Sequence, residues 1–176
     1  MKKSIIAFFL FTALFTSANA QAVKGTFSPL QEETRVNFIV DFSEADIMGM
    51  SEDEFYDYEE DWEHDKVEVL SLFTNYANDV MDNVPRLGNY KNVNYTLKLI
   101  VRAVDIKGNY DCDVLLMKGD DVIGEGIGLM AKGGKFGSKL NLMKDGAENT
   151  GKALGKFLLK AIKMKKPGKV REYSDV

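Results

Sequence analysis

The acidic block between Glu52 and Asp65 is the densest group of side chains that could do chemistry in this chain of 176 residues. It holds nine carboxylates and no Lys or Arg. Asp57, Asp61 and Asp65 are four residues apart, so on one helix they would share a face and could collect calcium weakly. Rigid calcium sites usually need loop carbonyls as well, and the chain has no D-x-D-x-D-G loop. We therefore interpret the block first as a solvated helix face.

Nucleophilic and metal chemistry have few candidate residues, because the chain has one histidine, His64, and one cysteine, Cys112. Neighbouring carboxylates favour a surface ion pair for His64, and strand alternation turns Cys112 into the core beside Val114, so we expect no Cys–His pair. One His and one Cys are too few for a zinc site, and no G-x-S-x-G elbow is present. A hydrolase with two facing carboxylates stays open as the least favoured function, because their separation depends on the fold.

Two glycine patterns have spacings that occur in ligand-binding loops. Residues 146–152 match the G-x4-G-K spacing of a phosphate-binding loop, but Ala153 replaces the magnesium-binding Ser or Thr, and the segment has a helical pattern. Gly124, Gly126 and Gly128 alternate along a predicted strand and should share one face. They would leave a possible groove for a helix face, a large aromatic ring or a ligand, and we expect packing within the chain to fill it.

The first twenty residues have the order of an export signal: two lysines, an apolar run over residues 5–15, and an A-x-A site that ends at Ala20. The apolar run is too short to span a bilayer of about 30 Å. We expect cleavage after Ala20, or at a second acceptable site after Ala22, and a periplasmic or secreted protein. The single cysteine excludes an internal disulfide, and because it does not follow the apolar run directly, we expect no lipid anchor. Residues 21–176 contain no second apolar run near 18 residues, so we expect no membrane span in the mature chain.

Charge is distributed unevenly along the chain. The formal net charge of −4 becomes −6 when Lys2 and Lys3 leave with the signal, so we expect no nucleic-acid partner. Residues 41–65 hold twelve acids without a Lys or Arg, whereas residues 143–176 hold nine Lys and Arg against four acids. This asymmetry could steer a partner. It could also only complement helix dipoles and keep the surface soluble.

Hydrophobic periodicity predicts the elements that position these residues. Alternation indicates four strands, at residues 34–42, 94–105, 110–117 and 122–131, and a short edge strand could include Ile47 and Met48. Ser51 and Glu54 form a capping box that opens a helix, which should bend near residues 64–66 and stop by Asn83, before Pro85. The apolar stripe of that helix is Phe55, Tyr58, Trp62, Val69, Phe73, Tyr76, Ala77 and Val80. A last helix is expected over residues 144–163, with Gly151 and Gly155 pressed against a sheet.

This order of elements predicts an α+β fold. We expect a two-layer sandwich, with an antiparallel or mixed four-stranded sheet and two helices on one face. A right-handed crossover could set strand 34–42 parallel to a strand of the meander. The expected organisation is a signal peptide (1–20), a flexible leader (21–33), a single α+β domain (34–166) and a basic disordered tail (167–176).

The segment NYTLKLIVRAVDIKGNYDCDVLLMKGDDVIGEGIGLMAKGG, followed by a helix of Gly, Ala and Lys, resembles small bacterial envelope proteins. The similar families are the curli-secretion-lipoprotein and TolB-N-terminal-like types, which alternate a strand, a helix, a strand hairpin and a last helix. The resemblance lies in element lengths and glycine placement over about half of the chain and includes no diagnostic motif. The acylated cysteine of the lipoprotein members is absent here. The resemblance implies a scaffold or assembly-accessory role and assigns no catalytic residue.

These observations favour a non-enzymatic envelope protein that binds another envelope protein or joins an assembly, with no cofactor. The candidate contact residues are Asp57, Asp61, Asp65, Lys160, Lys163 and Lys166. The alternative is a module that binds a small molecule or calcium through the glycine face or the acidic block.

Overall fold

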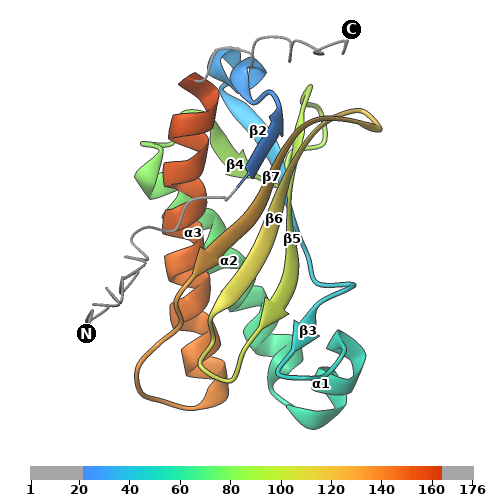
Figure 1. Cartoon of the computed structure of the whole chain (residues 1–176), viewed down its shortest axis with the longest axis vertical. Helices are drawn as coiled ribbons and strands as arrows, with labels where there is room; N and C mark the ends of the chain where they lie inside the picture. Colours follow the sequence, from blue (N-terminus) through green and yellow to red (C-terminus); the bar gives the residue numbers. More distant parts are fainter. Residues whose placement is uncertain (1–21, 164–176) are drawn as a thin grey trace, which may run out of the picture.

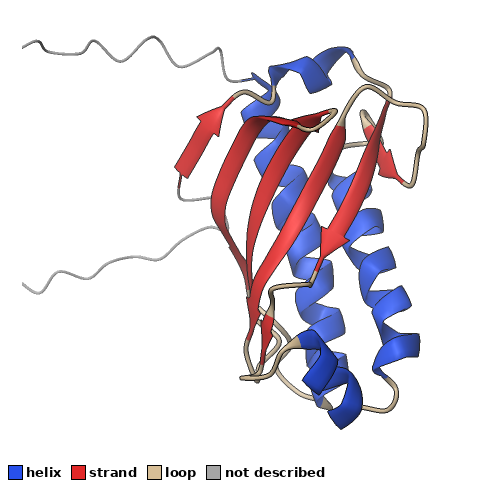
Figure 2. Cartoon of the chain, turned by 90° about the vertical axis from the view of Figure 1, so that its right-hand side faces the viewer, coloured by secondary structure: helices blue, strands red, loops and turns tan. Residues whose placement is uncertain are grey.

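The computed structural model of the chain describes residues 22–163. It is an α+β protein in which a mixed seven-stranded sheet is covered on one face by two long helices, as Figures 1 and 2 show from two sides. The strands are β1 (Ala22–Gly25), β2 (Arg35–Asp41), β3 (Asp46–Ile47), β4 (Arg86–Gly88), β5 (Thr96–Val104), β6 (Tyr110–Lys118) and β7 (Asp121–Ala131). The helices are α1 (Glu52–Tyr58), α2 (Trp62–Val80) and α3 (Lys139–Lys163), with a 3₁₀ turn η1 (Ser28–Glu32).

The strand order is β1-β7-β6-β5-β2-β4, and β3 also pairs with β5. The meander β5–β6–β7 is antiparallel, and β2 lies parallel to β5, with Asn37 opposite Thr96. The four predicted strands are therefore present, but the sheet is larger than the four strands expected. The prediction omitted β1 and β4, of four and three residues, because such short segments carry too little alternation to be recognised.

The helix-facing side of the meander is a continuous apolar core. Its buried side chains on β5 and β6 are Leu97, Leu99, Val101, Val104, Tyr110, Cys112, Val114 and Leu116. The ladders shift between Val101 and Ala103 and again between Cys112 and Val114. The second shift changes which residues of β7 face the helices. Before the shift these residues are Gly124 and Gly126, and after it they are Leu129 and Ala131, both buried.

The capping box predicted at Ser51 opens α1, but the helical segment breaks at residues 59–61 rather than near 64–66. Glu59 leaves helical geometry with φ −116° and ψ 92°. The break turns the chain so that Phe55 and Trp62, both buried, meet edge to face with ring centroids 5.3 Å apart. α2 ends at Val80, within the predicted limit, and α3 begins at Lys139, before the predicted start.

The described part of the chain includes the segment expected to be a flexible leader. β1 pairs with β7, and Phe27 and Leu30, the latter in η1, are buried in the core. Two isolated apolar residues in a polar stretch form no period, so the sequence did not reveal this packing. Residues 1–20 and 167–176, predicted as signal peptide and tail, lie outside the described residues.

The two long helices approach each other at Gly151 and Gly155 of α3. A Cβ on Gly151 would lie 2.7 Å from the carbonyl oxygen of Phe73, and one on Gly155 would lie 2.8 Å from that of Ala77. These glycines therefore face α2, and the expectation that they press against a sheet was wrong. Their missing side chains let the two backbones touch.

The sheet edge at β4 is closed by a side chain from α2. The amide nitrogen of Asn78 donates to the carbonyl oxygen of Leu87 at 2.9 Å, and the Leu87 N–H donates to the amide oxygen of Asn78 at 2.7 Å. Both residues are buried. Asn78 thus satisfies the two backbone groups that β4 would otherwise present to another strand.

Candidate functional site

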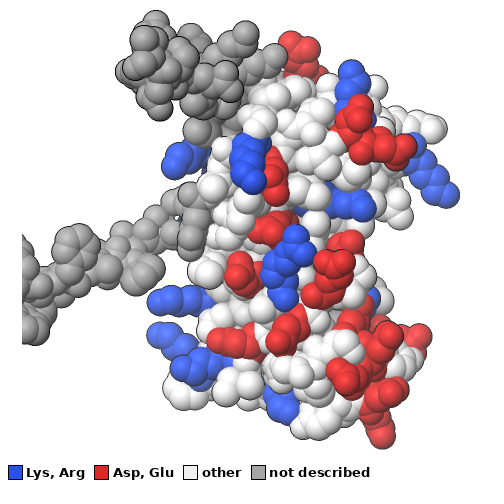
Figure 3. Space-filling view, turned by 45° about the vertical axis from the view of Figure 1, so that its right-hand side comes forward, with Lys and Arg blue, Asp and Glu red and all other residues white. Residues whose placement is uncertain are grey.

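The acidic corner, defined here as residues 51–65, comprises α1, the break after it and the first turn of α2. In Figure 3 red side chains gather at the lower right of the molecule, where this corner lies. Six of its carboxylates are exposed: Asp53, Glu54, Asp57, Glu60, Asp61 and Glu63. The fold therefore concentrates the acidic stretch of the sequence on one end of the molecule.

Local hydrogen bonds stabilise the ionised form of Glu54 at the start of the acidic corner. The backbone N–H of Ser51 donates to Oε2 of Glu54 at 2.8 Å, and the Ser51 hydroxyl donates to the same oxygen at 2.9 Å. These two bonds hold the pKa of Glu54 below its usual value, and the bond from the backbone N–H has the larger effect. The positive end of the α1 dipole also favours carboxylates in this first turn.

The predicted set of three aspartates is divided by the break in the helix. Asp57 belongs to α1, Asp61 precedes the first residue of α2, and Asp65 lies within α2, so they do not share one helix face. Asp65 pairs with Lys144 of α3, at 3.1 Å between Oδ1 and Nζ. Asp57 and Asp61 take part in none of the ion pairs within residues 22–163. Among the described residues, no three His, Cys, Asp or Glu side chains are grouped to hold a metal ion.

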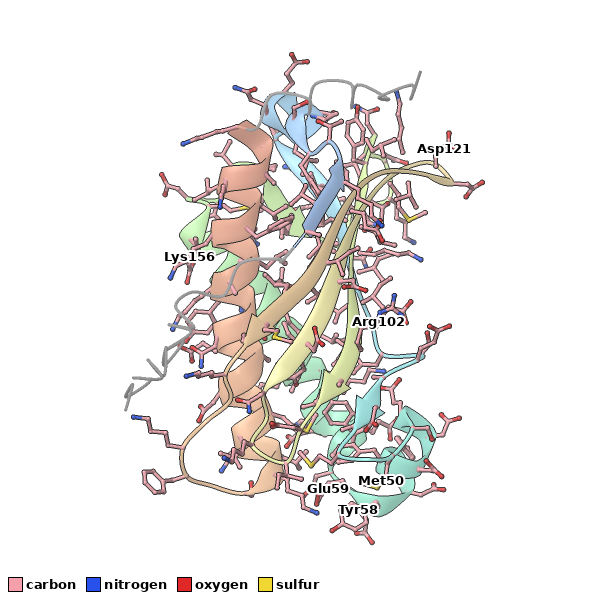
Figure 4. The ribbon with its side chains drawn as sticks, viewed as in Figure 1. Met50, Tyr58, Glu59, Arg102, Asp121 and Lys156 are labelled. Carbon is pink, nitrogen blue, oxygen red and sulfur yellow. The ribbon has the colours of Figure 1, made fainter. Side chains whose placement is uncertain are left out.

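Two exposed tyrosines accompany these carboxylates. Tyr58 is 56% exposed, whereas helical spacing predicted that it would be buried. The difference arises because α1 ends at Tyr58, so the apolar face of the helix does not continue past it. Figure 4 shows Tyr58 at the lower end of the molecule with Met50 and Glu59. Tyr56 is 47% exposed and donates to Oε2 of Glu63 at 3.0 Å, a bond that raises the pKa of the phenol. Exposed tyrosines offer rigid contact area to a partner.

The predicted basic contact residues lie toward the other end of α3. The predicted residues Lys160 and Lys163 are exposed, and with Lys156, which was not among the predicted contact residues, they form one basic stripe at spacings of four and three. Figure 4 places Lys156 on the side of the molecule away from the label of Tyr58. From Lys144, which pairs with the corner, to Lys160 the helix rises by roughly 24 Å. The structure therefore does not bring the two predicted surfaces together, and Lys166 lies outside the described residues.

Aromatic rings fill the space over the predicted glycine groove. A Cβ on Gly124 would lie 3.1 Å from the ring of Phe27, and one on Gly126 would lie 2.5 Å from the ring of Phe157. These two rings meet edge to face, with centroids 5.2 Å apart. Gly128 does not continue this face, because it sits at the shift in the ladder with φ 72°. Its N–H donates to Oδ1 of Asp113 at 3.0 Å.

The remaining sequence motifs do not form a reactive site within the described residues. Residues 146–152, with the spacing of a phosphate-binding loop, lie in the middle of α3 and are helical, as their pattern indicated. His64 is exposed on α2, whereas Cys112 is buried on β6, so the two side chains occupy different environments.

A cluster on the open face of the sheet was missed by sequence reasoning. Nε of Arg102 donates to Oδ2 of Asp113 at 2.9 Å, and another guanidinium nitrogen lies 3.3 Å from Oε2 of Glu44. Burial raises the pKa of the neighbouring Asp111. Strand alternation predicts that Asp111 and Asp113 share the outer face, but not that both oxygens of Asp113 are bound, by Arg102 and Gly128.

The thiol of Cys112 is expected to be inert in the folded protein. Burial raises its pKa far above the usual value, so neither access nor a thiolate is available to a disulfide reagent. Ellman's reagent at pH 8 should release no colour from native protein and one equivalent per chain in denaturant. A His64→Cys variant, with a second cysteine on an exposed position, should react rapidly with one equivalent while folded. Rapid reaction of the native parent chain would contradict this prediction.

Comparison with protein-family models, curated proteins and solved structures gives no match to this chain. The resemblance to envelope proteins in element lengths and glycine placement therefore stays a prediction. Within residues 22–163, no helix combines the length and the apolar character needed to cross a membrane.

Proposed function

We propose that this chain is a non-enzymatic periplasmic or secreted envelope protein whose acidic corner binds a basic surface on another envelope protein. The observation that carries the proposal is the set of six exposed carboxylates beside two exposed tyrosines. None of the six takes part in an ion pair within residues 22–163. The export signal expected over residues 1–20 supports the location.

A rigid support under the corner favours binding. Trp62 is 1% exposed and packs edge to face against both Phe55 and Phe42, at 5.3 and 5.8 Å between ring centroids. Lys66 of α2 pairs with Glu52 of α1 and so ties the two helices together. Because these contacts order the surface before a partner arrives, binding requires little further loss of conformational entropy.

The charge of the corner defines the partner. Carboxylates of one sign repel a second acidic surface and attract a basic one, and such steering raises the association rate at low salt. The tyrosines can then contact the aliphatic stems of the partner's Lys and Arg side chains or stack on guanidinium groups. We therefore expect a basic protein surface and an affinity that falls as salt concentration rises.

Photo-cross-linking can test this assignment in the export compartment. Tyr58 is replaced by a photoreactive phenylalanine derivative, and cross-linked proteins are identified by mass spectrometry. The same replacement at Tyr90, on the loop after β4, serves as the control. We expect a basic envelope protein to be captured from position 58 and not from position 90. Identical products from both positions would contradict the proposal.

Affinity for the purified partner should depend on the charges of the corner. The triple variant Asp57→Asn, Glu60→Gln, Asp61→Asn should weaken binding about tenfold or more, at roughly 0.5 kcal/mol for each exposed charge contact. The matched control Asp82→Asn, Asp120→Asn, Asp121→Asn changes the net charge equally through exposed acids elsewhere. Isothermal titration calorimetry should find the control within twofold of the parent chain. Equal weakening by both variants would show that only net charge matters.

A further inference from the structure

Two loops meet at the end of the sheet that lies beside the acidic corner. One is the β5–β6 turn, residues 105–109, and the other is the β7–α3 loop, residues 132–138, at the lower left of Figure 1. The two are together called the loop tip. Phe136 is 90% exposed and Ile106 is 68% exposed, the two highest values among the large hydrophobic residues that the structure describes. The tip therefore presents apolar side chains that the core does not use.

Hydrogen bonds and a close backbone contact hold the two loops of the tip together. The backbone N–H of Gly133 donates to Oδ1 of Asn109 at 2.8 Å. A Cβ on Gly133 would lie 1.9 Å from the carbonyl oxygen of Lys107. Within the turn, Oδ1 of Asp105 accepts from the backbone N–H groups of Lys107 and Asn109, at 2.8 and 3.0 Å. The exposed ring of Phe136 is thus carried on an ordered support, so covering it requires little further ordering of the loops.

The loop tip is basic. Lys107, Lys132 and Lys135 are exposed and belong to none of the ion pairs within residues 22–163. The one acid of the tip is Asp105, whose carboxylate accepts the hydrogen bonds of the turn. Figure 3 shows blue side chains at the lower left of the molecule and the red ones of the acidic corner at the lower right. The same end of the molecule therefore carries a basic surface and an acidic one.

The two surfaces are neighbours, but their charges do not pair within one chain. Nζ of Lys139, the first residue of α3, donates to the hydroxyl of Tyr58 at 2.5 Å and lies 4.2 Å from the centre of that ring. This contact joins the end of the loop tip to the edge of the acidic corner. In the part of the chain that the structure describes, no tip lysine pairs with a carboxylate of the corner. These lysines and carboxylates are therefore available for contacts between chains.

We propose that the loop tip docks on the acidic corner of a second copy, in a dimer with two-fold symmetry. The tip requires an acidic surface with exposed aromatic rings, and the chain itself supplies one. In a two-fold dimer the tip of one copy contacts the corner of the other, and the reverse contact is made as well. Two neighbouring surfaces of opposite charge suit this rule, because a two-fold axis between them places each on its opposite. Phe136 then packs against Tyr56 and Tyr58, and the tip lysines face the corner carboxylates.

The dimer regulates the site of the proposed function, and this part of the inference rests on that function. Each acidic corner is covered by the tip of the other copy, so a basic envelope protein must displace one copy in order to bind. Because the charges that meet are exposed in each free copy, the dimer is weak and dissociates as the salt concentration rises. The concentration of the chain therefore sets how much of the acidic corner is free.

Sedimentation equilibrium of the full mature chain tests the dimer. We expect dimers at low salt and dissociation at physiological salt. Two charge-reversed variants should each raise the dissociation constant about tenfold or more. The tip variant is Lys107→Glu, Lys132→Glu, Lys135→Glu, and the corner variant is Asp57→Lys, Glu60→Lys, Asp61→Lys. An equimolar mixture of the two should form a heterodimer, because both of its contacts then join surfaces of opposite charge.

A third variant separates geometry from net charge. Lys91→Glu, Lys118→Glu, Lys156→Glu changes the net charge as the tip variant does, through exposed lysines elsewhere. Mixed with the corner variant, it should form heterodimers about tenfold less tightly than the tip variant does, because one of the two contacts joins like charges. Phe136→Gln should weaken the parent dimer about tenfold and leave the midpoint of urea unfolding unchanged, since the ring is exposed.

Three results would overturn the dimer. They are a parent chain that stays monomeric at low salt and about 1 mM, self-association that neither charge-reversed variant weakens, and assemblies that grow beyond two copies. If the monomer instead sediments with anionic vesicles and Phe136→Gln abolishes this, the tip binds lipid and the proposal fails.

Photo-cross-linking from position 58 of the tip variant keeps this proposal distinct from the proposed function. The tip variant has an unchanged acidic corner and forms no dimer, so it should capture more of the basic envelope protein than the parent chain does. Failure of this capture would contradict the proposed function and leave the dimer standing. Equal capture by the two chains, at concentrations where the parent chain is dimeric, would contradict the regulation.

Discussion

Replacing Gly151 by alanine should destabilise the protein by about 2 kcal/mol, in the range of core overpacking, although alanine is the better helix former. A Cβ at this position would lie 2.7 Å from the carbonyl oxygen of Phe73 and 3.0 Å from Cβ of Tyr76. Both neighbours are held by α2, so relief requires the two helices to move apart. The double variant Gly151→Ala, Gly155→Ala blocks both close approaches and should leave little folded protein at 37 °C.

Whether Gly151→Ala lowers or raises the stability shows whether packing against α2 or helix propensity has the larger effect. If α2 could shift freely, Gly151→Ala would instead stabilise the protein by about 1 kcal/mol through propensity. Urea unfolding followed by circular dichroism measures the difference. Lys156→Ala, an exposed substitution in the same helix, should change the free energy of unfolding by less than about 0.5 kcal/mol. A stabilised Gly151→Ala variant would contradict the described contact between the helices.

Removing the Asn78 amide should reduce the free energy of unfolding by a comparable amount. Asn78→Ala removes two short hydrogen bonds and leaves the buried N–H and C=O of Leu87 without partners. Each unpaired buried group costs about 1–3 kcal/mol, so we expect a loss of about 3 kcal/mol. Asn141→Ala, at an exposed position of α3, should stay within about 0.5 kcal/mol of the parent chain.

A second substitution at the same position gives this prediction a pH dependence. In Asn78→Asp, burial raises the pKa of the new carboxyl above its unfolded value, because ionisation is unfavourable there. The protonated acid can donate to the Leu87 carbonyl and accept from its N–H, whereas the ionised acid can only accept. Stability should therefore be close to that of the parent chain below the unfolded pKa and be lost as pH rises through the folded pKa. A constant difference between the two proteins from pH 4 to 8 would contradict this role.

The part of the fold that could be predicted is the part with long regular patterns. Alternation over nine or more residues located β5, β6 and β7, and the pair Ser51 and Glu54 located the start of α1. β4 could not be found in this way, because its middle residue is held by Asn78 of α2 rather than by a local pattern. The change in which residues of β7 face the helices could not be predicted either, because it depends on a shift in the register between β6 and β7.

The candidate site was predictable in composition but not in geometry. The density of carboxylates in residues 52–65 pointed to the acidic corner, whereas the spacing of Asp57, Asp61 and Asp65 suggested one helix face. The break after Tyr58 divides that face, because it lets Phe55 and Trp62 enter the same core. The same break exposes Tyr58, which helical periodicity had placed among buried residues. Tertiary packing of two aromatic rings thus decided what the corner presents to solvent.

Closure of the β4 edge by Asn78 also bears on how the chain behaves at high concentration. A strand edge with free backbone groups can recruit further polypeptide and grow into fibres. Here a single side chain from another element occupies those groups, so this edge is capped as soon as α2 reaches it. Folding intermediates in which α2 has not yet docked would be the species most prone to polymerise. Variants that delay docking of α2 should therefore form inclusion bodies more readily than their equilibrium stability suggests.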